Sequence, residues 1–161
     1  MSARAERVSM PSVQLVTSRY QNRKQIIASG LVTVRITLGA PRWSLGYELQ
    51  ATIRELAPTR DIFRMPPERF EVEYPARVLE HHGVEKLRRL FSEISAQHQG
   101  SGLILLCFED VTTEDLCCHR RLFARWWEEK TGEIVPELGR DLSVLDLNPD
   151  APDMAEPEPL F

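Results

Sequence analysis

The sequence predicts a single α/β domain, a Rossmann-like three-layer fold with helices packed on a mostly parallel sheet. Short runs rich in Val, Leu and Ile alternate along the chain with stretches that repeat apolar residues at helical spacing. This alternation is typical of a parallel or mixed sheet covered by helices. The length of 161 residues, of which 42% are apolar, is that of one compact domain with a substantial core.

Composition divides the chain into three parts. We expect a flexible N-terminus over residues 1–10, the α/β domain over residues 11–138, and an acidic, proline-rich tail over residues 139–161. The tail has few large apolar residues, so it cannot offset the entropy cost of ordering, and we expect it to be disordered.

Three apolar runs predict the strands of the sheet. Residues 12–18 and 31–38 are rich in β-branched and aliphatic side chains and are short enough to be buried strands. Residues 103–108, with the sequence LILLCF, have no polar member and therefore read as a strand buried on both faces.

Helical spacing of apolar residues predicts helices over residues 47–57, 84–97 and 116–132. The first would stop at Pro58 and the last at Gly132, which suits the end of a helix. Between the first two, we expect a break near Pro75, because proline lacks the N–H that a helix interior needs.

Charge and hydropathy limit the kinds of protein this can be. No segment approaches the roughly 18 apolar residues of a membrane span, and the first residues lack the apolar centre of a signal peptide, so we expect a cytoplasmic protein with no membrane partner. Residues 1–42 carry seven basic side chains against one acid, a net +6. Residues 133–161 carry eight acids against one base, a net −7, so the basic end can serve an anionic ligand and the acidic end can engage a protein partner.

Common catalytic and cofactor motifs are absent, and we expect neither a metal ion nor a cofactor. A phosphatase-like loop would need an arginine six positions after Cys107, where Thr113 stands. The chain has no GxxxxGK[ST] loop, no GxGxxG fingerprint and no CxxC pair. Adjacent cysteines rarely bind one ion together, which argues against a zinc site built from Cys117 and Cys118.

The densest group of chemically active residues follows the last predicted strand. Cys118, His119 and Arg120 fall in the first turn of the last predicted helix, where unpaired N–H groups and an arginine fork favour an anion. Glu109, at the end of the preceding strand, could orient Arg120 or act as an acid or base. Each residue also has a structural interpretation, with Cys107 as a small buried apolar group and His119 as a capping residue.

These residues also carry a resemblance to a known family. Val34-Arg35 in an early strand, Pro41-Arg42 after it, the strand end Leu105 to Glu109 and the sequence Cys118-His119-Arg120 resemble the family called domain of unknown function 488. The resemblance spans residues 13–132 and implies an α/β fold with these side chains in one cleft. The family usually has Asp-Val-Arg where this chain has Thr33-Val34-Arg35, so a mechanism that needs a second carboxylate beside Glu109 is not predicted. The biochemical role of the family is not established.

The leading functional hypothesis is that the domain binds, and processes if it is an enzyme, a phosphate-bearing ligand such as a nucleotide or a nucleic-acid end. His119 or Glu109 would then transfer the proton. The anion and the rim of its site would be contacted by side chains from the predicted strand ends and the helix start, namely Ser18, Arg19, Tyr20, Arg35, Arg42 and Arg120. This hypothesis predicts that Arg35, Glu109 and Arg120 share one pocket.

Two alternatives stay open. The domain could be a non-enzymatic module that binds a protein partner through its cleft or its acidic tail. It could also be a thiol-dependent enzyme that uses Cys118, because a helix N-terminus and neighbouring arginines lower the pKa of a cysteine.

Overall fold

A computed structural model describes residues 12–108 and 118–138 of the chain. Four parallel strands form its sheet, in the order β1-β4-β2-β3. Their bounds are β1 Leu15–Arg19, β2 Val32–Arg35, β3 Ala51–Thr52 and β4 Leu103–Cys107. The predicted α/β class and parallel sheet are confirmed. Strands β2 and β4 fall inside their predicted runs, and β1 overlaps its run but ends one residue later, at Arg19.

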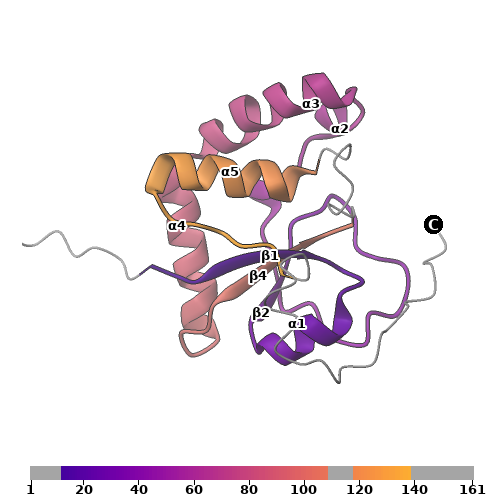
Figure 1. Cartoon of the computed structure of the whole chain (residues 1–161), viewed down its shortest axis with the longest axis vertical. Coiled ribbons are helices and arrows are strands. Elements are labelled where there is room, and N and C mark those ends of the chain that lie inside the picture. The colour runs from indigo at the N-terminus through magenta and orange to yellow at the C-terminus, as the bar shows by residue number, and fades with distance from the viewer. Residues whose placement is uncertain (1–11, 109–117, 139–161) are drawn as a thin grey trace, which may run out of the picture.

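Helices cover the sheet on both faces. Figure 1 shows α1 on one side of the strands and α5 on the other. The helical segments are α1 Arg23–Ser29, the 3-10 turn η2 Arg54–Leu56, α2 Arg60–Phe63, α3 Pro67–Tyr74, the π-helical η3 Pro75–Leu79, α4 Glu80–Gln97 and α5 His119–Thr131. No helix within the described ranges is long and apolar enough to cross a membrane.

Two apolar clusters, one on each face, hold the layers together. The larger cluster joins Leu103, Leu105 and Cys107 of β4 to α4 and α5, where Phe91 and Trp127 are buried. The smaller cluster joins Ile104 and Leu106 to α1 and the loop after β2. All five residues of β4 are buried, as expected for a central strand whose side chains alternate between two covered faces.

The predicted helix over residues 47–57 is wrong. Residues 41–50 form a loop with bends at residues 42–43 and 46–47, and Gly46 has a φ of 81°. The segment then pairs with β2, where Gln50 N donates to Thr33 O at 3.0 Å and Ile53 N donates to Arg35 O at 3.0 Å. Pairing with an open sheet edge therefore overrides the helical spacing of its apolar residues, and only a 3-10 turn forms, at Arg54–Leu56.

The predicted break near Pro75 takes a different form. The chain stays helical through Pro75, from Pro67 to His82, with one π-helical turn at Pro75–Leu79. A π-turn relieves the clash between a proline ring and the carbonyl one turn earlier. The non-helical residue lies further on, at Gly83, whose φ of 82° and ψ of 161° kink α4. Helix α1 was not predicted, because its sequence is largely polar and only Ile26 is buried.

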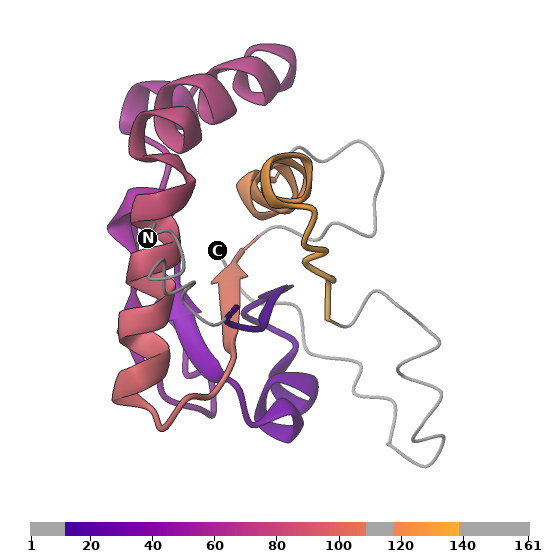
Figure 2. The same ribbon diagram turned by 90° about the vertical axis from the view of Figure 1, so that its left-hand side faces the viewer.

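Residues 133–138, which we call the strap, return from α5 to the free edge of β1 (Figure 2). Thr17 N donates to Pro136 O at 2.9 Å, and Leu138 N donates to Thr17 O at 2.7 Å. Val135 is buried in the larger apolar cluster. The strap thus pairs with the edge strand and brings its own side chains to the carboxyl ends of the strands.

Candidate functional site

The candidate site lies where the parallel strands end and α5 begins. Cys107 is the last residue of β4 and lies in register with Arg19 of β1. Cys118 is the N-cap of α5, with extended backbone and no side-chain cap hydrogen bond. Because carboxyl ends of parallel strands share one edge, two residues eleven positions apart in sequence meet there.

Two sulfur atoms and one guanidinium form the centre of the site. The Sγ atoms of Cys107 and Cys118 lie 2.9 Å apart, and neither cysteine is in a disulfide. Arg120 Nη1 donates to Cys107 Sγ at 2.7 Å and to Cys118 Sγ at 3.2 Å. All three side chains are buried, so the positive charge acts on the sulfurs with little screening by solvent.

Glu137 of the strap holds the other side of the guanidinium. Arg120 Nε donates to both carboxylate oxygens at 3.1 Å, and Nη2 donates to Oε2 at 3.0 Å. The carboxylate also accepts a 2.6 Å hydrogen bond from the hydroxyl of Thr17 on β1. This two-oxygen clamp fixes the plane of the guanidinium and aims Nη1 at the sulfurs.

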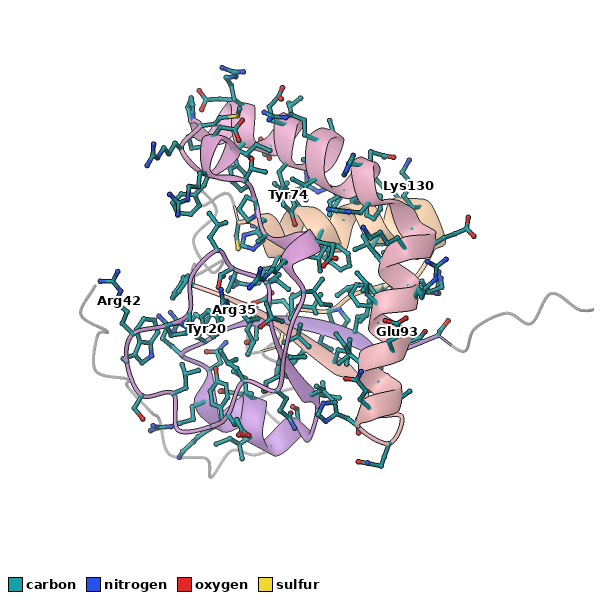
Figure 3. The ribbon with its side chains drawn as sticks, turned by 180° about the vertical axis from the view of Figure 1, so that it is seen from behind. Tyr20, Arg35, Arg42, Tyr74, Glu93 and Lys130 are labelled. Carbon is teal, nitrogen blue, oxygen red and sulfur yellow. The ribbon has the colours of Figure 1, made fainter. Side chains whose placement is uncertain are left out.

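His119 completes the cluster. Its Nε2 lies 2.8 Å from the carbonyl oxygen of Ile36, and because a carbonyl only accepts, Nε2 carries the proton. The imidazole packs edge-to-face on the ring of Tyr74, with centroids 5.6 Å apart. Tyr74, labelled in Figure 3, is itself fixed by a 2.6 Å hydrogen bond from its hydroxyl to Leu56 O. His119 also hydrogen-bonds the side chain of Cys118.

These contacts shift the ionisation of the cluster. Burial raises the pKa of the Cys118 thiol, but hydrogen bonds with Cys107 and His119 and the charge of Arg120 outweigh burial, so this pKa lies well below its usual value. Burial lowers the pKa of Arg120, but the two sulfurs and Glu137 raise it further above its usual range. The pKa of Tyr74 is raised by burial and by both sulfurs, so this residue stays neutral. The site therefore favours a thiolate at Cys118 beside a permanent guanidinium.

The donor types of Cys107, Cys118 and His119 suit a soft metal ion, and their ligand atoms lie within 4.8 Å of one another. The position a cation would need is taken by Arg120 Nη1, which already contacts both sulfurs. Its guanidinium is locked by Glu137 and cannot leave without breaking a buried ion pair. We therefore assign no metal ion to this cluster.

Other predicted site residues lie at the same edge of the sheet but have structural partners. Ser18 donates to Leu138 O at 2.9 Å, which ties β1 to the strap. The hydroxyl of Tyr20 lies 2.7 Å from that of Thr37. Arg19 Nε donates to Asn22 at 3.4 Å.

The structure does not bring the predicted arginines together. Val34 packs in the cluster under α5, so strand alternation places the next residue, Arg35, on the opposite face of the sheet from Arg120. Arg35 donates to the carbonyls of Thr37 and Leu38 at 3.3 and 3.0 Å. Arg42 is exposed on the loop after β2 and points away from the body of the molecule (Figure 3).

The prediction that Arg35, Glu109 and Arg120 share one pocket is therefore wrong for Arg35 and Arg120. Glu109 and Cys117 lie outside the described residues. What does converge is the pair Cys107 and Cys118 with His119 and Arg120. Cys107 is buried in the larger apolar cluster, as its structural interpretation predicts, and it is also a direct contact of both Cys118 and Arg120.

Two functional neighbours were missed by sequence reasoning, Glu137 and Tyr74. Glu137 lies between Pro136 and Leu138 in a segment assigned to the end of the domain, and the short apolar pair Ile134-Val135 is the one sequence signal that this segment packs on the sheet. Tyr74 precedes the predicted break at Pro75, and no sequence feature links it to His119.

Comparisons with known protein families, with curated proteins and with solved structures find no match for this chain. The resemblance to the domain of unknown function 488 and the Rossmann-like label therefore stay predictions, and function must be argued from the site itself.

Proposed function

We propose that the protein is a thiol-dependent enzyme in which the Cys118 thiolate attacks an electrophilic substrate. The observation that carries this proposal is the buried contact of Arg120 Nη1 with the sulfurs of Cys118 and Cys107. A thiolate is the nucleophilic form of cysteine, and a guanidinium held against it favours that form near neutral pH.

His119 is the proton donor of the proposed reaction. Its Nε2–H is held by Ile36 O, and the ring also hydrogen-bonds Cys118, so the imidazole is placed to take the thiol proton of Cys118 and to give it to the leaving group. Tyr74 and Ile36 hold the ring in place, and Glu137 holds Arg120, so both helpers of the thiolate are fixed before substrate arrives.

The phosphate-binding hypothesis has less support in this geometry. The guanidinium of Arg120 already hydrogen-bonds Glu137 and the two sulfurs. Arg35 and Arg42 lie away from this site. A phosphate-bearing ligand and a protein partner of the acidic tail stay predictions, and residues 139–161 of the tail lie outside the described residues.

The proposal is tested by alkylation of each cysteine with iodoacetamide over a range of pH, mapped by peptide mass spectrometry. Cys118 should react with a pH midpoint well below the value of about 8.5 for an unperturbed thiol. Arg120→Lys should raise that midpoint, because a lysine cannot contact both sulfurs and Glu137 with one planar group. Cys117→Ser, which keeps Cys107, Cys118, His119 and Arg120, is the matched control. A Cys118 that reacts with the midpoint of an ordinary thiol would refute the proposal.

A further inference from the structure

We propose that Cys107 is the second thiol of the reaction, and that the substrate is a small hydroperoxide which the pair Cys118 and Cys107 reduces by two electrons. The inference rests on the proposed role of Cys118 as nucleophile and adds the substrate class and a partner residue.

The spacing of the sulfurs carries the inference. At 2.9 Å, the Sγ atoms of Cys107 and Cys118 need to approach by only roughly 0.9 Å to reach the length of a disulfide bond. Cys107 is fixed at the end of a central strand that pairs on both sides, and Cys118 caps the helix that packs on that strand. Both sulfurs are therefore held in position to form a bond with each other.

The positions of the two cysteines in the fold distinguish their proposed roles. Cys118 lies at the N-terminus of α5, where unpaired N–H groups favour a thiolate, whereas Cys107 ends a central strand. The 2.9 Å contact lets the Cys107 thiol donate its proton to the Cys118 sulfur. Cys118 is then the first nucleophile and Cys107 is the protonated partner that acts second.

The proposed reaction is balanced in two steps. The Cys118 thiolate attacks the terminal oxygen of the hydroperoxide, the O–O bond breaks, and the alkoxide or hydroxide leaves as alcohol or water with a proton from His119. Cys118 is now a sulfenic acid. The Cys107 sulfur then attacks the Cys118 sulfur, the S–O bond breaks, and hydroxide leaves as water with the proton of Cys107. The two thiols are oxidised to one disulfide while the peroxide is reduced, and a small-molecule dithiol restores the pair by exchange.

The burial of the two sulfurs limits the size of the oxidant that can reach them. Cys107 is 0% exposed and Cys118 is 1% exposed, so a disulfide of another protein cannot reach either sulfur in this conformation. A small hydroperoxide carries the leaving oxygen that the mechanism needs and no bulky group. The guanidinium of Arg120 lies beside both sulfurs and can stabilise the charge that develops on the departing oxygen.

The test treats the full-length, reduced protein with one equivalent of hydrogen peroxide in the presence of a chelator, then counts free thiols and maps the peptides. The wild type and the matched control Cys117→Ser should each lose two thiols and form a disulfide between Cys107 and Cys118. Cys107→Ser should instead trap a sulfenic acid on Cys118, detected by its adduct with dimedone, and Cys118→Ser should form no disulfide.

Three results would overturn the inference: a wild type that keeps all its thiols, a disulfide that joins Cys117, or a Cys107→Ser variant without a sulfenic acid. The wild-type measurement needs no variant to fold. If Cys118 alkylates with a lowered pH midpoint but peroxide gives no disulfide, the peroxide inference fails while the proposed thiol function stands. If Cys118 alkylates with the pH midpoint of an ordinary thiol, both the proposed thiol function and the peroxide inference are wrong.

Discussion

Glu137→Ala should destabilise the protein strongly, because it leaves the buried charge of Arg120 without its carboxylate. The side chain of Arg120 is 1% exposed and that of Glu137 is 14% exposed, and they share three N–H to oxygen contacts of 3.0 to 3.1 Å. Removing one partner of a buried pair costs about 3–5 kcal/mol, far more than the 0–1 kcal/mol of an exposed pair. The Thr17 hydroxyl also loses its acceptor, so we expect the upper part of the range.

The assay is urea unfolding at pH 7 under reducing conditions, followed by tryptophan fluorescence. Glu137→Ala should lower the midpoint without a large change in the dependence of unfolding free energy on urea, which indicates lost stability and not a change of unfolded state. Lys130→Ala, which breaks the exposed ion pair with Glu80, is the control and should remain close to the wild type. A loss below about 1 kcal/mol for Glu137→Ala would refute the reasoning, because it would place Arg120 in contact with solvent.

Three further predictions test other parts of the structure. The pKa of Cys118 is lowered in the folded state, so its contribution to stability is fully present above pH about 8.5 and is lost as pH falls through the folded pKa. The difference in unfolding free energy between wild type and Cys118→Ser, measured at several pH values, should therefore grow as pH rises, by at most about 1.4 kcal/mol per pH unit; a difference that shrinks would contradict the shift. Tyr74→Phe should lower the unfolding free energy by about 1–3 kcal/mol, since Leu56 O loses its buried donor, and an unchanged value would mean that the carbonyl finds another partner. A chain ended after Leu138 should keep the thermal midpoint of the full chain, whereas one ended after Gly132 loses the strap and should unfold at a much lower temperature; equal midpoints for the two would show that the strap contributes little.

Local patterns in the sequence were enough to predict three of the four strands and the last two helices. The apolar runs that mark β1, β2 and β4 are bounded by polar or turn residues, and α4 and α5 have clear apolar spacing. The helix predicted over residues 47–57 is wrong, because pairing with β2 is a long-range contact that the spacing of these residues does not encode.

The candidate site was predicted only in part, again because local sequence patterns do not encode long-range contacts. Cys118, His119 and Arg120 are neighbours in sequence and were identified together, but their partners come from β4, the strap and the end of β2. The error over Arg35 has a simple origin: alternation along β2 separates Val34 from Arg35, yet the sequence does not say which face α5 covers.

The central claim is that Cys118 is held as a thiolate by Cys107, His119 and Arg120. It is tested most directly by following the Cβ chemical shift of Cys118 by NMR while the reduced protein is titrated, with Cys118→Ser used to assign the signal. The account predicts a single transition with a midpoint well below the value of about 8.5 for a free cysteine. A midpoint at or above that value would show that burial outweighs the guanidinium, and would contradict the account.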